Sequence, residues 1–269
     1  AAEFLQDIET LVVVGSKAPV SFFAYPDKPS YLPAETADVL TLADVRHDAL
    51  DALTRLADAL DAPESPAVLQ VATTHALEPG PMNMLELGKV IANHLPENAI
   101  VSDEGATNGM GAFAYTGYSA PHEWLMLTGG AIGQGLPLAL GAAVACPDQK
   151  VIALQADGGA MYTVQSLWTM VRENLDVTVV LLNNSSYAIL NIEMERVGVV
   201  NPSDKARSLL DLSNPTIDWV HIAQGMGMSA SRAESVADFD QQFADAMQQQ
   251  GPRLIEVILP GYMFSNPQG

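Results

Sequence analysis

The sequence has one cysteine and few basic residues, and both shortages exclude classes of function. Cys146 cannot form an internal disulfide bond, and the small apolar residues before it are typical of a buried, unreactive thiol. Only 12 Lys and Arg stand against 32 Asp and Glu, which gives a formal net charge of −20. Such a chain repels a phosphate backbone, so we expect no nucleic-acid partner. The acidic composition does not exclude an anionic cofactor, because backbone N–H groups and a divalent cation can bind it.

Long hydrophobic runs are also missing. No uninterrupted apolar run reaches the roughly 18 residues that a membrane span needs, and the N-terminus has no signal pattern. We therefore expect no membrane partner and a cytoplasmic location. The composition, with 48% hydrophobic and 16% charged residues, is that of a folded, globular chain.

The first part of the chain, residues 1–62, carries the signals of a small α/β unit. Apolar runs at residues 11–14 and 20–25 predict strand-like segments. Within residues 43–62, leucines on one helical face predict an amphipathic helix; they are Leu50, Leu53, Leu56 and Leu60. The mixture of Pro, Ser, Thr and Glu that follows predicts an interdomain linker at residues 63–80.

Helical and strand patterns alternate through the rest of the chain, residues 81–269. The helices are expected at 84–94, 107–113, 133–145, 162–172, 217–226 and 236–247, and the strands at 99–102, 124–127, 151–155, from 177 onward, and at 254–259. Such alternation predicts a doubly wound α/β domain, with a parallel sheet and helices on both faces. Ligands of these folds bind in loops at the carboxyl ends of the strands.

Two loops at predicted strand ends carry hard oxygen ligands. Asp157 supplies a carboxylate, Asn184 an amide oxygen, and the following Ser186 a backbone carbonyl. These are ligands that Mg²⁺ or Ca²⁺ takes when phosphates and water complete the shell of the cation. The residues after Asp157, from Gly158 and Gly159 to Ala160, open a helix and allow close backbone approach to a diphosphate. Taken singly, each loop also fits a simple turn, the first capped by its aspartate.

The spacing of 27 positions between Asp157 and Asn184 resembles the thiamine diphosphate signature, in which Gly-Asp-Gly precedes Asn-Asn by some twenty-odd residues. From about Gly80 to Glu256 the chain resembles the carboxyl-terminal domain of the benzoylformate decarboxylase, pyruvate decarboxylase and acetolactate synthase superfamily. Residues 1–62 are similar to the end of the central domain of the same enzymes, a domain that binds flavin in some relatives. The fold implied is the thiamine diphosphate-binding fold.

The resemblance implies roles for further residues. In the glycine loop, the carbonyl of Gly130 would receive the aminopyrimidine, and Ile132 would force the folded cofactor conformation. Ala106 and Thr107 match positions near the diphosphate. Tyr187 matches a position at the phosphate end of the cofactor, although packing explains a tyrosine there equally well. Without the family, the glycine loop is also a means of tight helix-to-sheet packing.

Three departures from the family pattern limit what the resemblance implies. Ala156 stands where the family has a glycine, which is tolerable if its φ is negative. The activating glutamate of the family belongs to an amino-terminal domain, so no catalytic residue is assigned in this chain. Ile189, Leu190 and Glu193 match substrate-facing positions. Their side chains match neither the pattern of pyruvate decarboxylases nor that of acetolactate synthases, so neither substrate specificity is implied. Leu190 fits a core position equally well.

The resemblance therefore implies an enzyme that decarboxylates or ligates small 2-oxo acids with thiamine diphosphate and Mg²⁺. This chain supplies the diphosphate and metal half, and a homodimer or tetramer of the intact enzyme, or a separate pyrimidine-binding domain, is expected. The alternative is a non-catalytic cofactor-binding or assembly domain that partners a separate pyrimidine-binding chain. A dinucleotide-binding protein is a third hypothesis, weakened by the absence of a G-x-G-x-x-G fingerprint.

Overall fold

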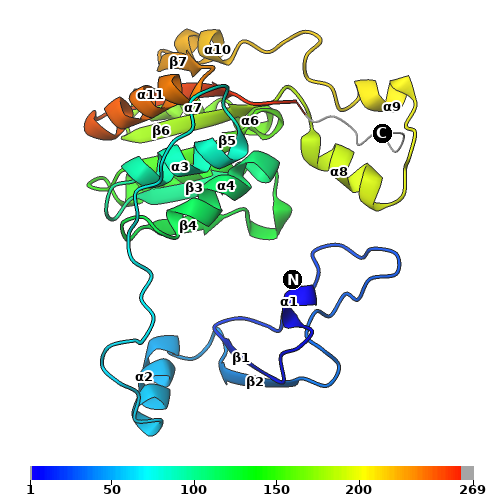
Figure 1. Cartoon of the computed structure of the whole chain (residues 1–269). Coiled ribbons are helices and arrows are strands. Elements are labelled where there is room, and N and C mark those ends of the chain that lie inside the picture. The colour runs from blue at the N-terminus through cyan, green and yellow to red at the C-terminus, as the bar shows by residue number, and fades with distance from the viewer. Residues whose placement is uncertain (1, 262–269) are drawn as a thin grey trace. The chain divides into compact units, whose positions relative to one another are not determined.

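The computed structural model describes residues 2–261. The chain divides into two compact units (Figure 1): the first consists of Ala1–Leu69 and Arg196–Gly198, and the second of Gln70–Glu195 and Val199–Gly269. In the described part of the chain, every helix is too short or too polar to cross a bilayer.

The first unit is a small α/β arrangement. After a short helix, α1 (Ala2–Leu5), strands β1 (Thr10–Val14) and β2 (Asp38–Ala43) pair in parallel, and helix α2 (Ala49–Ala59) follows. The expected strand at residues 20–25 is wrong: only an isolated bridge from Val20 to Tyr31 forms. Flanking prolines at 19 and 26 lack the N–H that a strand ladder needs. Strand β2 had not been predicted.

Helix α2 confirms the predicted helix but begins later, at Ala49. The Asp48 side chain caps it by accepting the backbone N–H of Asp51. None of its residues is buried, and Leu50 and Leu60 are 76% and 70% exposed. The amphipathic pattern therefore predicted the helix correctly, although Leu50 and Leu60, two of the leucines expected on its apolar face, are exposed.

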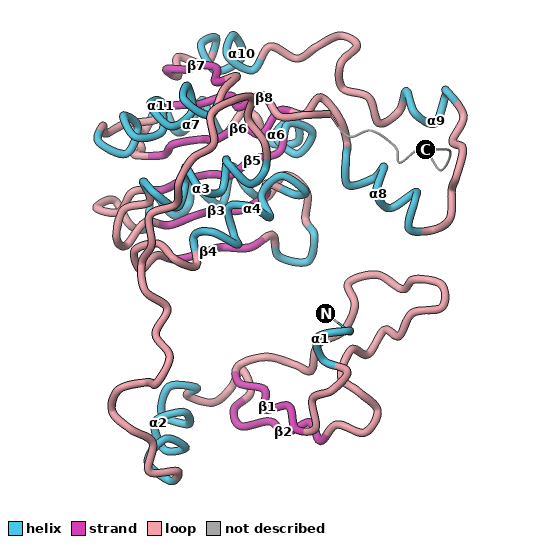
Figure 2. The backbone as a smooth tube through the Cα atoms, in the orientation of Figure 1, coloured by secondary structure: helices cyan, strands magenta, loops and turns pink. Residues whose placement is uncertain are grey.

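The second unit contains a six-stranded parallel sheet in the order β4-β3-β5-β6-β8-β7 (Figures 1 and 2). The strands are β3 (Ile100–Glu104), β4 (Glu123–Met126), β5 (Val151–Ala156), β6 (Val177–Asn183), β7 (Ser229–Ala233) and β8 (Arg253–Ile258). The chain runs outward from β3 to β4 and then returns to the other side of β3 with β5. This reversal is a topological switch point, where doubly wound sheets bind ligands. The predicted fold class is confirmed.

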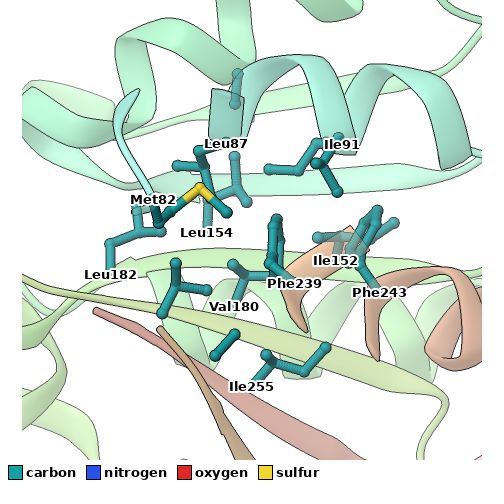
Figure 3. Packing of buried hydrophobic residues seen from close by; sticks show 14 of the residues in the cluster. Met82, Leu87, Ile91, Ile152, Leu154, Val180, Leu182, Phe239, Phe243 and Ile255 are labelled. Carbon is teal, nitrogen blue, oxygen red and sulfur yellow. The ribbon is translucent and has the colours of Figure 1, made fainter. Parts of the chain in front are cut away.

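Helices cover both faces of this sheet. Those of the unit are α3 (Met84–His94), α4 (Ala106–Thr116), the 3₁₀ turn η1 (Thr128–Gly130), α5 (Gly135–Ala145), α6 (Asp157–Thr163), α7 (Ser166–Arg172), α8 (Ala188–Arg196), α9 (Asp204–Ser208), α10 (Trp219–Gly225) and α11 (Val236–Gln248). Buried side chains of α3, α4 and α11 form one core, which Figure 3 shows around Leu154 and Phe239. Side chains of α5, α6, α7 and α10 form the other.

The predicted strands and helices of the second unit all form, with three differences. The helix expected at 162–172 begins earlier, at Asp157, and is interrupted between α6 and α7. Helices α8 and α9 were not expected. Strand β7 was missed because its sequence, Ser-Ala-Ser-Arg-Ala, has none of the β-branched or aromatic residues that mark strands, as an edge strand allows.

Candidate functional site

Asp157 links the ends of two neighbouring strands. Strands β5 and β6 pair up to Ala156 and Leu182, so the loops after them begin side by side. Asp157 is buried and opens α6. Its Oδ1 accepts the N–H of Gly158 at 2.8 Å, and its Oδ2 accepts the N–H of Ser185 at 2.8 Å. The structure therefore brings Asp157 against the loop that carries Asn184.

Burial changes the electrostatics of this carboxylate. Desolvation raises the pKa of Asp157 to about 6, and backbone hydrogen bonds from Gly158 and from the loop at 184–186 offset only part of that rise. The backbone N–H donors stabilise the ionised carboxylate, but by less than burial destabilises it. A divalent cation would favour the ionised form and oppose this rise.

We expect the raised pKa to make the stability of the metal-free chain depend on pH. The folded chain keeps a proton on Asp157 that the unfolded chain releases between about pH 3.8 and about pH 6. The free energy of unfolding should therefore fall as the pH rises through that window. Because one pKa unit is worth about 1.4 kcal/mol, the fall due to this group is on the order of 3 kcal/mol.

Chemical denaturation at about pH 4 and about pH 7 checks this expectation. The comparison is with Asp157→Asn, which removes the titrating group and leaves every other carboxyl in place. Tyr187 interacts electrostatically with Asp157, but burial raises the pKa of Tyr187 further above this window. If both proteins lost the same stability between the two pH values, the raised pKa would be wrong.

The loop after β6 presents Asn184 and Ser186 next to Asp157. Asn184 is buried, and its Oδ1 accepts the N–H of Ser186 at 3.1 Å. Ser185 has a φ of 53°, which lies in the left-handed region. This conformation is unfavourable for residues other than glycine. Ser186 is held further by Asn191, whose Nδ2 donates to its Oγ at 3.0 Å. The loop is thus fixed from several sides.

The donor set of this loop fits a hard divalent cation. It combines one carboxylate, one amide oxygen and a backbone carbonyl, a set that Mg²⁺ completes with phosphate and water oxygens. Nowhere among residues 2–261 do three or more His, Cys, Asp or Glu side chains gather as a metal site. A cation at Asp157 would be held by this carboxylate, by neutral protein oxygens and by oxygens of a bound ligand.

The two glycines after Asp157 leave room for packing that a side chain would block. A Cβ on Gly158 would clash with the ring of Tyr187, which lies against it. A Cβ on Gly159 would lie 2.6 Å from Oε1 of Glu104. Both glycines and Ala160 are buried. Tyr187 is half-buried, so packing on Gly158 accounts for one side of its ring.

The glycine loop with Gly130 and Ile132 is held in place by Glu104. This buried carboxylate accepts the N–H groups of Gly133 and Gly135, each at 2.6 Å. Gly130 has a φ of 69°, and Ile132 is 55% exposed. Hydrogen bonds therefore tie the end of this loop to Glu104, while the side chain of Ile132 stays exposed.

Ala106 and Thr107 begin α4 directly after the end of β3. Ala106 is exposed and has a φ of 48°, an unusual conformation for alanine. Backbone strain of this kind concentrates at functional sites, which supports the expectation for this segment. Thr107 is half-buried.

The three residues predicted to face substrate lie on α8. Ile189 and Leu190 are 39% and 43% exposed, so Leu190 is not a core residue. Glu193 is half-buried one turn further along the helix. Their helix begins at Ala188, directly after the loop that carries Asn184 and Ser186.

Three residues of the site region escaped sequence analysis: Glu104, Asn183 and Glu256. All three are buried and hydrogen-bonded. A charged residue inside the apolar run of β8 was a visible signal for Glu256, since buried charges are rare unless they are paired. The other two sit at strand ends, where a polar residue is unremarkable.

Comparisons with known proteins agree with the motif. Residues 103–257 match the family described as “Thiamine pyrophosphate enzyme, C-terminal TPP binding domain”. Over 261 residues the chain is 46% identical to “Putative acetolactate synthase large subunit IlvX” of Mycobacterium tuberculosis, covering 97% of this chain and 50% of that protein. It is 34% identical over 170 residues to acetolactate synthase 1, chloroplastic, of Nicotiana tabacum, covering 61% of this chain and 25% of that protein.

A solved structure shows the same fold. The thiamine diphosphate-dependent 4-hydroxybenzoylformate decarboxylase of Rhodococcus jostii RHA1 superposes with a TM-score of 0.76 at 22% identity, covering 97% of this chain and 50% of that one. The chain spans about half the length of the IlvX relative and a quarter of the tobacco one.

Proposed function

The chain belongs to the thiamine pyrophosphate enzyme family through its C-terminal cofactor-binding domain, and on this premise we propose that it holds the diphosphate and Mg²⁺ of that cofactor in an enzyme acting on 2-oxo acids. The observation that carries the proposal is the buried carboxylate of Asp157, bound to the N–H of Ser185 in the loop of Asn184. It joins the two halves of the family signature at one edge of the sheet.

The residues of this chain divide the work of binding. Asp157, Asn184 and the carbonyl of Ser186 hold Mg²⁺, while the backbone from Gly158 to Ala160 and the start of α4 face the diphosphate. Gly130 and Ile132, on the loop fixed by Glu104, receive the ring end of the cofactor. Bound thiamine diphosphate supplies the electron sink for carbon dioxide loss.

We propose that α8 forms a wall of the substrate site. Ile189 and Leu190 are exposed apolar side chains next to the metal-binding loop, and they would exclude water from the reacting carbon. Glu193 lies further along and would face the polar end of the substrate. The residue that activates the cofactor is not assigned in this chain.

The overall reaction is either decarboxylation or the joining of two 2-oxo acids. The relatives named as acetolactate synthases support carboligation. A homodimer or tetramer, a complementing pyrimidine-binding domain and a cytoplasmic location are part of the same proposal. The alternative role, a non-catalytic cofactor-binding or assembly domain, uses the same site.

Calorimetric titration of the chain with thiamine diphosphate, with and without Mg²⁺, tests the proposal. We expect binding that requires the metal, because one carboxylate and neutral oxygens cannot hold a diphosphate by charge alone. Thiamine monophosphate is the matched control, since it has the same rings but a shorter phosphate chain and should bind more weakly. Metal-independent binding, or a preference for NAD, would contradict the proposal.

A further inference from the structure

Glu256 is a fully buried carboxylate on β8, between β6 and the edge strand β7. It lies on β8 opposite Leu181 of β6, so Asn183, two residues further along β6, points to the same face of the sheet. Its Oε1 accepts the Nδ2 of Asn183 at 2.7 Å, and its Oε2 accepts the Nε of Arg232 at 2.8 Å. Both oxygens of Glu256 therefore have defined partners.

Asn183 carries this contact to the metal-binding loop. Its Oδ1 accepts the N–H of Ser185 at 2.9 Å and the Oγ of Ser185 at 3.1 Å. The same N–H donates to Oδ2 of Asp157 at 2.8 Å. Hydrogen bonds thus run without a break from Arg232 through Glu256, Asn183 and Ser185 to Asp157.

The chemistry of the carboxylate fixes which way the amide of Asn183 faces. An ionised glutamate accepts hydrogen bonds and donates none, so it selects the NH₂ end of the amide. The amide oxygen is then left facing Ser185, whose left-handed backbone persists only where its surroundings hold it. Arg232, about 40% exposed, supplies the charge that makes a buried glutamate tolerable.

We propose that Glu256 is a positioning residue for the metal site: held by Arg232, it orients Asn183, which sets the Ser185 backbone and thereby the carboxylate of Asp157 and the amide of Asn184. This inference rests on the proposed function. The proposal also gives the two adjacent asparagines of the signature different roles. Asn183 orients the loop through Glu256 and Ser185, and Asn184 would bind the metal.

The first test is Glu256→Gln, measured as the Mg²⁺ dependence of thiamine diphosphate binding. A glutamine cannot accept from both Asn183 and Arg232 while keeping the amide of Asn183 in place. We expect the affinity for Mg²⁺ to fall on the order of 10–100-fold, as it does when partners behind a metal ligand are removed. Arg232→Met leaves the buried Glu256 without its ion-pair partner, so we expect a fall in Mg²⁺ affinity in the same direction together with a loss of stability.

A matched control separates positioning from general damage to the fold. Lys89→Met breaks another ion pair, between Lys89 and Glu86 on α3, whose Nζ and Oε1 lie 2.7 Å apart. We expect it to lower the thermal stability without changing the affinity for Mg²⁺. The double variant Glu256→Gln with Asn183→Ala should bind Mg²⁺ no more weakly than Asn183→Ala alone, since Glu256 acts only through Asn183.

Hydrogen exchange at the Ser185 amide gives a reading that needs no cofactor. Faster exchange in Glu256→Gln, with no change in Lys89→Met, supports the positioning role. Additive losses of affinity in the double variant, or an unchanged Mg²⁺ affinity in a folded Glu256→Gln protein, would overturn this inference and leave the proposed function standing. A natural chain that binds no cofactor with Mg²⁺ would overturn both.

Discussion

An Asp157→Ala variant should lose Mg²⁺-dependent binding of thiamine diphosphate almost completely. The substitution removes the one carboxylate of the proposed donor set. It leaves the N–H of Gly158 without its acceptor and the N–H of Ser185 with Asn183 as its remaining acceptor. Because partners behind a ligand are already worth 10–100-fold, we expect the loss of the ligand itself to cost on the order of 100-fold or more. Asn184→Ala should cost less, since it removes a neutral ligand. Titration calorimetry at fixed Mg²⁺ measures both.

The control for charge is Asp148→Ala, at an exposed position just before β5 and hence at the opposite end of the strands from Asp157. It changes the net charge of the chain by the same amount but removes no proposed ligand, so binding should be unchanged. If Asp157→Ala and Asp148→Ala bound the cofactor equally well, the metal assignment would be refuted. Thermal melting of each variant without ligand shows whether any loss of binding comes from unfolding.

Gly111→Ala is expected to give the largest loss of stability among single-methyl additions. Gly111 on α4 lies against the backbone of α3, and a Cβ there would clash with the carbonyl oxygen of Met84 and lie 2.9 Å from its carbonyl carbon. A backbone group cannot rotate away as a flexible side chain can, so the two helices would have to separate. We expect the free energy of unfolding to drop by about 3 kcal/mol.

A second glycine provides the control for this variant. Gly141 lies on α5, and nothing lies within 4 Å of the place where its Cβ would be. Gly141→Ala should therefore stabilise the chain by about 0.5–1 kcal/mol, the ordinary gain from replacing glycine inside a helix. Denaturant melts of the two variants would show opposite signs. A Gly111→Ala protein as stable as the natural chain would mean that α3 and α4 do not pack as described.

The sequence determined the fold of the second unit because each signal was local. Strands β5 and β6 are short, mostly apolar runs, and the apolar residues of α3 and α11 recur at helical spacing. The same kind of reading placed Asp157 and Asn184 at the ends of two strands, and from there at one edge of a parallel sheet. Residues 20–25 show its limit, since this apolar run bracketed by prolines looks like a strand yet forms only an isolated bridge.

Only the tertiary structure decided which groups support the site. Glu104 meets the glycine loop about thirty positions away, and Glu256 meets Asn183 across two strands that are 73 positions apart in sequence. Likewise, Leu190 is exposed on α8, although its apolar character fits a core position equally well. Only the packing of the helix decides between the two. Hydrogen bonds and burial of this kind depend on which strands become neighbours, and chain folding sets that order. The physical reason is that spacing along the chain encodes local geometry, whereas the partners of a buried charge are chosen by packing between distant segments.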